Sequence, residues 1–310
     1  MCGIIGCVGT PKNNLFTHTL LTNLLKETQR RGPHSTGHFG VNALDNVTFH
    51  FKSPIPAKIY VQLTEWTLLK NVNSKALIGH ARYKTKGGEY NNLNNHPHIS
   101  SSGNIALVHN GTIYKYEKHK RDYTLRGESD SEMLLQIIVD QRNVINGIKK
   151  IYELFGSTGD FSCEVIYRNP DDGRTRFFFF RDPGRPGRFI DAKSVLGQYF
   201  FCSTNIIWKD AIKGACDDED KMSELDLNRL PVQIIPAYQI WEIDAQTLEI
   251  TKHDVNPPEK REAKPKRIVV VKEKTSVKSD FIKIDNGEKA STYMNKYRYE
   301  FKNYCCGDFC

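Results

Sequence analysis

The chain begins MCGIIGCV, a run of small and β-branched residues that is typical of a β-strand. Gly9 and Pro11 would end this strand, which is therefore expected over residues 2–8. Cys2 has two interpretations. It is a small apolar residue of that strand, or removal of Met1 leaves its thiol and a free α-amine on one residue, a nucleophile with its own base. The remaining residues have to decide between them.

Strands predominate in the rest of the chain, with a few long helices between them. Residues 15–31 have apolar side chains at three-to-four spacing and end at Gly32 and Pro33, which predicts a helix. A second helix is expected to begin at Ser129, where Ser129 and Glu132 form a capping box. Further strands are expected at residues 75–80 and 104–109, and hairpins at residues 161–167 with 175–181 and at residues 238–244 with 247–251.

Composition places the chain among ordinary globular proteins. Of its 310 residues, 39% are hydrophobic and 26% are charged. The longest apolar runs, residues 177–180 and 268–271, are too short to cross a bilayer, and no basic segment precedes the first apolar residues. We therefore expect a cytoplasmic protein without membrane partners, whose eight cysteines are mostly reduced.

The net charge of +8 is concentrated near the end of the chain. From residue 256 onward, 13 Lys and Arg oppose 8 Asp and Glu, which accounts for +5 of the total. The stretch NPPEKREAKPKR at this point has the composition of a linker. We therefore divide the chain into a domain at residues 1–255 and a basic linker and tail at residues 256–310. A solvated tail is favoured over a nucleic-acid site.

Six ordered motifs give the chain a family resemblance: MCGIIG, RRGPHSTG, GHARYKTKGG, NNHPH, LVHNGTIY and ESDSE. Together they resemble the glutaminase domain of class II glutamine amidotransferases, within the N-terminal-nucleophile hydrolase superfamily. Later segments look most like the glutaminase half of asparagine synthetases, whereas NNHPH is more similar to glucosamine-6-phosphate synthases. The resemblance covers about residues 1–255 and implies an α+β fold, a four-layer αββα sandwich, with a short C-terminal extension.

The resemblance assigns the reaction to three residues. Cys2, exposed as the N-terminal residue once Met1 is removed, would attack the glutamine amide, with its own α-amine as the base. The Asn110 side chain and the Gly111 backbone N–H would bind the tetrahedral oxyanion. The alternative interpretation of Asn110-Gly111 is a plain turn after a strand.

Recognition of a free amino acid needs opposite charges for its two ends. By resemblance, Arg82 binds the α-carboxylate, for which a planar guanidinium is suited, and Asp130 binds the α-ammonium. In the alternative interpretation, Arg82 is an ordinary surface charge and Asp130 is an ordinary residue at the start of a helix. Further binding residues carried over from the family are Thr85, His96 and Arg31. His34 stands where the family usually has Asp, and Lys84 and Lys86 make the loop after Arg82 unusually basic.

No cofactor and no metal are expected. Cys305, Cys306 and Cys310 have poor spacing for zinc. The 55 residues after the domain contain no phosphate-binding loop, so L-glutamine is the expected substrate and a separate synthase or acceptor protein would receive the ammonia. Two other functions stay open: an amidase acting on another amide, and a catalytically silent module that senses glutamine.

Overall fold

The structure is a computed structural model that describes residues 2–44, 46–156, 159–218 and 227–257. The first of its two sheets is antiparallel and contains β1. Its strands are β1 (Gly3–Val8), β2 (Ser35–Asn42), β3 (Thr48–Ser53), β4 (Ser74–Arg82), β9 (Arg188–Ala192), β10 (Gln198–Cys202) and β11 (Val232–Ile234), in the order β11-β9-β10-β1-β4-β2-β3.

The second sheet is also antiparallel and has β6 and β7 near one edge. Its strands are β5 (His98–Ile99), β6 (Ile105–Ile113), β7 (Gly159–Arg168), β8 (Thr175–Arg181), β12 (Gln239–Asp244) and β13 (Ile250–Asp254), in the order β13-β12-β8-β7-β6-β5.

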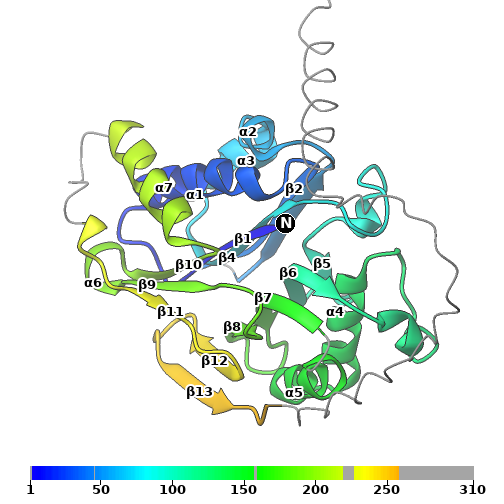
Figure 1. Cartoon of the computed structure of the whole chain (residues 1–310). Coiled ribbons are helices and arrows are strands. Elements are labelled where there is room, and N and C mark those ends of the chain that lie inside the picture. Colours follow the sequence, from blue (N-terminus) through cyan, green and yellow to red (C-terminus); the bar gives the residue numbers. More distant parts are fainter. Residues whose placement is uncertain (1, 45, 157–158, 219–226, 258–310) are drawn as a thin grey trace, which may run out of the picture. The chain divides into compact units, whose positions relative to one another are not determined.

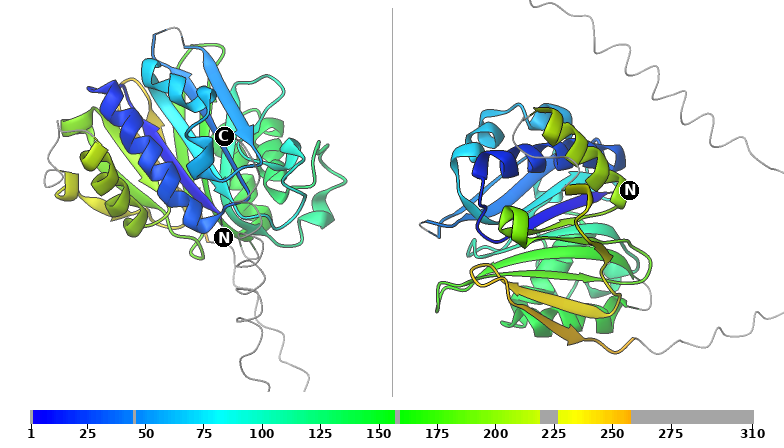
Figure 2. Two further views of the ribbon diagram at one scale, coloured as in Figure 1. Left: turned by 90° about the horizontal axis from the view of Figure 1, so that it is seen from above. Right: turned by 90° about the vertical axis from the view of Figure 1, so that its left-hand side faces the viewer.

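Helices cover the outer face of each sheet (Figures 1 and 2). The first sheet carries α1 (Asn14–Thr28), α2 (Ala57–Tyr60), α3 (Thr64–Thr67) and α7 (Asn205–Asp218), and the second carries α4 (Asp130–Asp140) and α5 (Val144–Phe155). The short α6 (Lys193–Leu196) joins β9 to β10. The described ranges also contain the 3-10 helices η1 (Gln29–Arg31), η2 (Leu68–Asn71), η3 (Asn92–Asn94) and η4 (Tyr116–His119). The expected αββα sandwich is confirmed.

Three apolar clusters hold the layers together. One lies between the first sheet and its helices, one between the second sheet and its helices, and the third between the two sheets. The central strands contribute alternate side chains to two of them, because successive side chains point to opposite faces. On β1, for example, Ile4 belongs to the inter-sheet cluster and Ile5 to the cluster beneath α1.

The same alternation brings the predicted site together. Ile4, Ile78 and Val108 are all members of the inter-sheet cluster, and a step of two residues along their strands leads to the same face. Three predicted site residues therefore lie on the inner faces of the sheets: Cys2, Arg82 and Asn110. Gly3 pairs with Ala81 in the antiparallel β1–β4 register, which sets Cys2 opposite Arg82.

Most of the expected elements are confirmed, but the strand expected at residues 104–109 extends further, and the alternative interpretation of Asn110-Gly111 as a turn is wrong. β6 continues through both residues to Ile113, and Gly111 pairs with Phe161 of β7. The long β6–β7 ladder supplies the pairing that a turn would have ended. Asn110 consequently lies within a strand, where its side chain has a fixed direction.

The expected capping box at α4 is only half right. The Ser129 hydroxyl accepts a hydrogen bond from Ser131 N at 3.3 Å, so Ser129 is the N-cap. The Glu132 carboxylate, however, accepts from the backbone N–H groups of Arg126 and Gly127, at 3.1 and 2.8 Å. It stabilises the segment before the cap rather than the cap residue itself.

Several expectations concern residues that the structure does not describe. The basic tail beyond residue 257, with Cys305, Cys306 and Cys310, lies outside the described ranges. The cysteines within them are free thiols: Cys2, Cys7, Cys163, Cys202 and Cys216. Within those same ranges, no helix combines the length and the apolar character needed to span a membrane.

Candidate active site

Cys2 directly precedes β1, and its side chain is only 9% exposed. Its sulfur contacts the first residue after β4, with Tyr83 O and Tyr83 N both 3.4 Å from Sγ. Burial raises the pKa of the thiol, while the Tyr83 N–H and the charge of Arg82 lower it less strongly. The thiol is therefore protonated at neutral pH, and a nucleophilic role requires a base that takes its proton during attack.

Asn110 is fully buried on β6, and neither its Oδ1 nor its Nδ2 has a hydrogen-bond partner among the described residues. The strand lies close to β4 here, because His80 Nε2 on β4 is 3.1 Å from His109 O. A buried amide without a partner costs stability. It is also a donor that is free to bind a developing negative charge.

Gly111 fits its position only because it has no side chain. Its φ is +156°, and a Cβ there would lie 1.7 Å from Asp160 O on β7. Any other residue would push β6 away from β7. The close approach of these strands thus requires glycine directly after Asn110.

Arg82 lies at the end of β4 and is 3% exposed. Its Nη1 donates to Asn95 Oδ1 at 2.9 Å, and its Nη2 donates to the carbonyls of Lys86 and Gly87, the latter at 3.0 Å. The Nε–H and the second Nη1–H have no partner in the described structure, so they can still bind a carboxylate. Burial lowers the pKa of Arg82, and the thiolate form of Cys2 and the carboxylates of Asp130 and Glu89 act in the opposite direction.

Asp130 is the first residue of α4 and is 4% exposed. Its Oδ2 accepts from Ile113 N at 2.7 Å, two residues beyond Gly111 on β6. The next residue, Ser131, places its hydroxyl 2.8 Å from His109 Nδ1. The start of α4 is therefore attached on both sides of Asn110 and Gly111 to the strand that carries them.

Arg31, at the end of η1, contacts the backbone of Cys2. The Arg31 Nε donates to Cys2 O at 2.7 Å. Burial lowers the pKa of Arg31, with the neighbouring charge of Arg185 acting in the same direction. The contact holds the residue that directly precedes β1 in place.

Thr85 and His96 have no recorded contact with Cys2. Thr85 is exposed, and its hydroxyl makes no hydrogen bond within the described part of the chain. The His96 ring is buried and stacks on His80, with 3.9 Å between ring centroids. Burial holds the pKa of His96 well below 6.5, and the ring is neutral.

The loop after Arg82 is held by its own charged residues. Lys84 forms an ion pair with Glu89 at 3.0 Å, and its backbone N–H donates to His34 Nδ1 at 3.0 Å. Lys86 pairs with Glu117 and lies 4.6 Å from the centroid of the Tyr116 ring. Both lysines are half-exposed and already have acidic partners within the domain.

Four residues of this region were missed as site residues in the sequence: His80, Asn94, Asn95 and His109. The signal was present, because they lie in the motifs GHARYKTKGG, NNHPH and LVHNGTIY. Their contacts bring distant segments together, and a motif alone does not show such contacts. Four buried histidines also cluster here, yet no group of His, Cys, Asp and Glu in the described ranges is arranged to hold a metal.

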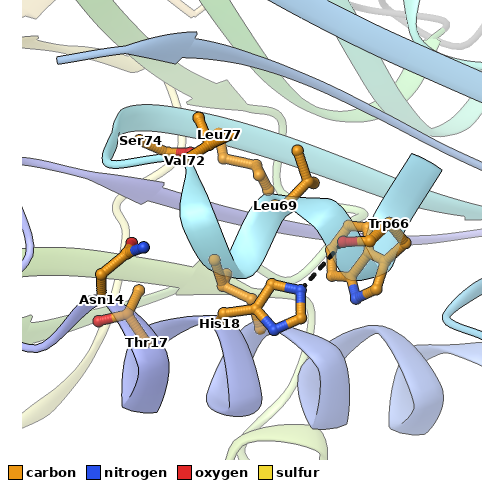
Figure 3. Close-up of a pocket in the computed structure, with 9 residues that line it drawn as sticks. Asn14, Thr17, His18, Trp66, Leu69, Val72, Ser74 and Leu77 are labelled. Atoms are coloured by element: carbon orange, nitrogen blue, oxygen red, sulfur yellow. Dashed lines mark hydrogen bonds between the residues drawn. The ribbon is translucent and has the colours of Figure 1, made fainter. Parts of the chain in front are cut away.

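A small cavity elsewhere is too small to be a substrate site. It lies between α1 and the segment from α3 to β4, with His18 and Trp66 among its lining residues (Figure 3). Its volume is about 10 Å³, room for one water molecule at most. Leu77, which also lines it, points away from the inter-sheet face that bears Arg82.

Comparison with known proteins finds curated relatives that are similar in sequence to part of this chain. No protein-family model matches the chain. Glutamine–fructose-6-phosphate aminotransferase (isomerizing) of Bacillus licheniformis is 36% identical over 152 residues, which are 48% of this chain and 23% of the relative. The protein of that name from Streptococcus mutans is 31% identical over 184 residues, 55% of this chain and 28% of the relative. The chain thus spans about a quarter of the length of these relatives.

Solved structures share the fold. Glutamine phosphoribosylpyrophosphate amidotransferase from B. subtilis matches with a TM-score of 0.58 at 18% identity, covering 82% of this chain and 49% of that one. A structure described as the allosteric regulatory enzyme of purine biosynthesis gives the same TM-score at 19% identity, with the same coverage. The described part of the chain is therefore similar to class II glutamine amidotransferases and has the N-terminal-nucleophile hydrolase fold.

Proposed function

We propose that this domain hydrolyses L-glutamine to glutamate and ammonia through a thioester on Cys2. The observation that carries the proposal is the convergence of Cys2, Arg82, Asn110 and Asp130 at one end of the inter-sheet layer. This set offers a nucleophile, an oxyanion donor and opposite charges for the two ends of a free amino acid.

The chemistry follows from these groups. The α-amine of Cys2, once Met1 is removed, accepts the thiol proton as sulfur bonds to the amide carbon. The Asn110 Nδ2–H and the Gly111 N–H stabilise the oxyanion. The C–N bond then breaks, and nitrogen takes a proton to leave as ammonia. Water hydrolyses the remaining thioester to glutamate and restores the thiol.

Ammonia release also implies an acceptor. The matched segment is about a quarter of the length of the curated relatives, and we assign no acceptor reaction to the residues described here. We propose that a separate synthase or acceptor protein receives the ammonia. The half-exposed Lys84 and Lys86 are already paired with Glu89 and Glu117, so a partner would have to compete for them.

Intact-protein mass spectrometry tests the assignment directly. The protein is incubated with a glutamine analogue that carries an electrophilic δ-carbon. We expect the mass of the chain without Met1 plus one adduct, located on Cys2 and blocked by excess L-glutamine. An unmodified Cys2, or an adduct that L-glutamine does not compete with, would contradict the proposed function.

A further inference from the structure

Asn94 and Asn95 lie at the junction of three chain segments and are both fully buried. They follow the start of η3, between the loop after β4 and the short strand β5. Buried amides are expected to satisfy all their hydrogen-bonding groups. The partners they use show which parts of the molecule they hold together.

The Asn95 side chain holds Arg82. Its Oδ1 accepts from Arg82 Nη1 and from Ser35 Oγ, both at 2.9 Å. Its Nδ2 donates to Glu89 O at 2.6 Å and to Asn92 Oδ1 at 2.9 Å. Because guanidinium can only donate, the atom facing Arg82 must be the amide oxygen. Asn95 thus joins Arg82 to β2 and to the far end of the loop after β4.

The Asn94 side chain joins that loop to the segment before α4. Its Oδ1 accepts from Glu128 N at 2.7 Å, and its Nδ2 donates to Gly88 O at 3.1 Å. Two glycines flank the amide closely. A Cβ at Gly87 would lie 2.5 Å from Asn94 Cγ, and one at Gly127 would lie 2.7 Å from Asn94 Oδ1. The side chain is confined from both sides.

This pair therefore connects the two charged groups of the candidate site. Arg82 is held by Asn95, and Asp130 begins the helix two residues after Glu128, which Asn94 holds. We propose that Asn94 and Asn95 are positioning residues that set Arg82 and Asp130 at the separation of the charges of a free α-amino acid. The inference rests on the proposed function and deepens it by naming what determines substrate selection.

Binding measurements separate positioning from a general structural role. In a Cys2→Ala background, which excludes turnover, calorimetry measures the affinity of the protein for three compounds. They are L-glutamine, 4-aminobutanamide without the α-carboxylate, and 4-carbamoylbutanoic acid without the α-amine. Adding Asn95→Ala should weaken the binding of L-glutamine and of 4-carbamoylbutanoic acid, which both carry the carboxylate, about 10- to 100-fold. This is the effect expected from losing one hydrogen bond to a charged group. The affinity for 4-aminobutanamide should stay within about threefold of the parent.

Two further variants sharpen the test. Asn95→Asp keeps an oxygen acceptor for Arg82 and should recover most of the affinity for L-glutamine, even though the donor to Glu89 O is lost. Asn91→Ala is the matched control, because Asn91 is exposed in the same segment and, among the described residues, its side chain accepts a hydrogen bond from Leu93 N alone. It should leave all three affinities unchanged.

A double-mutant cycle tests the route through Arg82. Arg82→Ala combined with Asn95→Ala should bind L-glutamine no more weakly than Arg82→Ala alone. Equal losses for all three compounds, or full additivity of the two substitutions, would overturn the inference. Parent protein that binds glutamine tightly without hydrolysing it would overturn the proposed function and leave the positioning role intact. Parent protein that does not bind glutamine would overturn both.

Discussion

The two ends of the inter-sheet layer differ in what fills them. At one end Phe177 and Phe179 of β8 stack on Phe201 of β10, with centroids 4.6 and 5.6 Å apart. At the other end the inner faces carry Cys2, Arg82 and Asn110, and buried polar atoms lack protein partners. The aromatic end is a filled core. The polar end gives up stability for groups that can act on a ligand.

Replacing the proposed nucleophile should give the largest contrast between these two ends. Cys2→Ala should lower glutamine hydrolysis roughly 10⁴-fold or more, since no other described thiol lies with Arg82 and Asn110. Its unfolding midpoint should stay near that of the parent. Ammonia release and urea unfolding measure the two effects.

Cys7 is the matched control on the same strand, because it faces the cluster beneath α1. Cys7→Ala should keep the activity and lose roughly 1 kcal/mol of stability. Similar activity of the Cys2 variant and the parent would remove Cys2 from the mechanism.

Adding a methyl group at Gly111 should damage both properties. The Cβ of Gly111→Ala would meet Asp160 O at 1.7 Å, so β6 must shift away from β7. We expect a loss of at least about 3 kcal/mol in the free energy of unfolding, together with the activity. Gly88→Ala, where a Cβ meets nothing within 4 Å, should change the stability little. Similar stabilities of the two variants would show that the strands separate easily.

Asn110 and Val108 are two residues apart on the same face of β6 and should respond in opposite ways. Asn110→Ala should lower kcat about 10²- to 10³-fold, as loss of an oxyanion donor does, with no loss of stability because its amide has no protein partner. Val108→Ala should lose about 2–3 kcal/mol of stability and keep kcat. Steady-state kinetics and urea unfolding measure kcat and stability. Loss of both kcat and stability in both variants would contradict the prediction.

The comparison also shows what the sequence could predict. Strand and helix positions followed from local periodicity, as at residues 2–8 and 15–31, because each strand contributes alternate side chains to a core. The family motifs indicated Cys2, Arg82, Asn110 and Asp130. The course of β6 through Asn110 and Gly111 was not predicted, since the β6–β7 pairing that overrides the local turn preference is a long-range contact.

The supporting contacts of the site were also beyond sequence reasoning. Asn95 bonds Arg82 across a folded loop, and His80 reaches His109 on the other sheet. Glu132 bonds backbone groups ahead of the helix instead of the capping residue. Each contact depends on where the chain returns in space, and a motif fixes only which residues are adjacent along it.

The polar end should make the fold sensitive to acid. Burial lowers the pKa of His80, His96, His98 and His109 from 6.5, to about 3 for His80. Below pH 6.5 the unfolded chain takes up protons that the folded chain does not, so stability falls by up to about 1.4 kcal/mol per pH unit for each histidine. Urea unfolding from pH 7 to 5 measures the slope. His98→Phe should reduce this slope by the contribution of one histidine. An unchanged slope would contradict the burial argument.

Glu164 should give the opposite pH dependence, from one group rather than four. It points into the inter-sheet layer beside Gly6, fully buried, and neither carboxylate oxygen has a partner in the described ranges. Burial raises its pKa well above 4.5. Between pH 4.5 and that raised pKa the unfolded chain has lost a proton that the folded chain keeps. Stability is therefore fully present below pH 4.5 and falls by up to about 1.4 kcal/mol per pH unit above it.

Glu164→Gln has nearly the same shape and no proton to lose, so it isolates this effect. The variant and the parent should unfold at similar urea concentrations at pH 4, and the variant should become progressively more stable than the parent as the pH rises to 8. Glutamine hydrolysis should stay unchanged, because Glu164 packs beside Gly6, four residues along β1 from Cys2. A constant stability difference across this pH range would show that Glu164 is ionised in the fold, and the inter-sheet layer would then be polar beyond its active end.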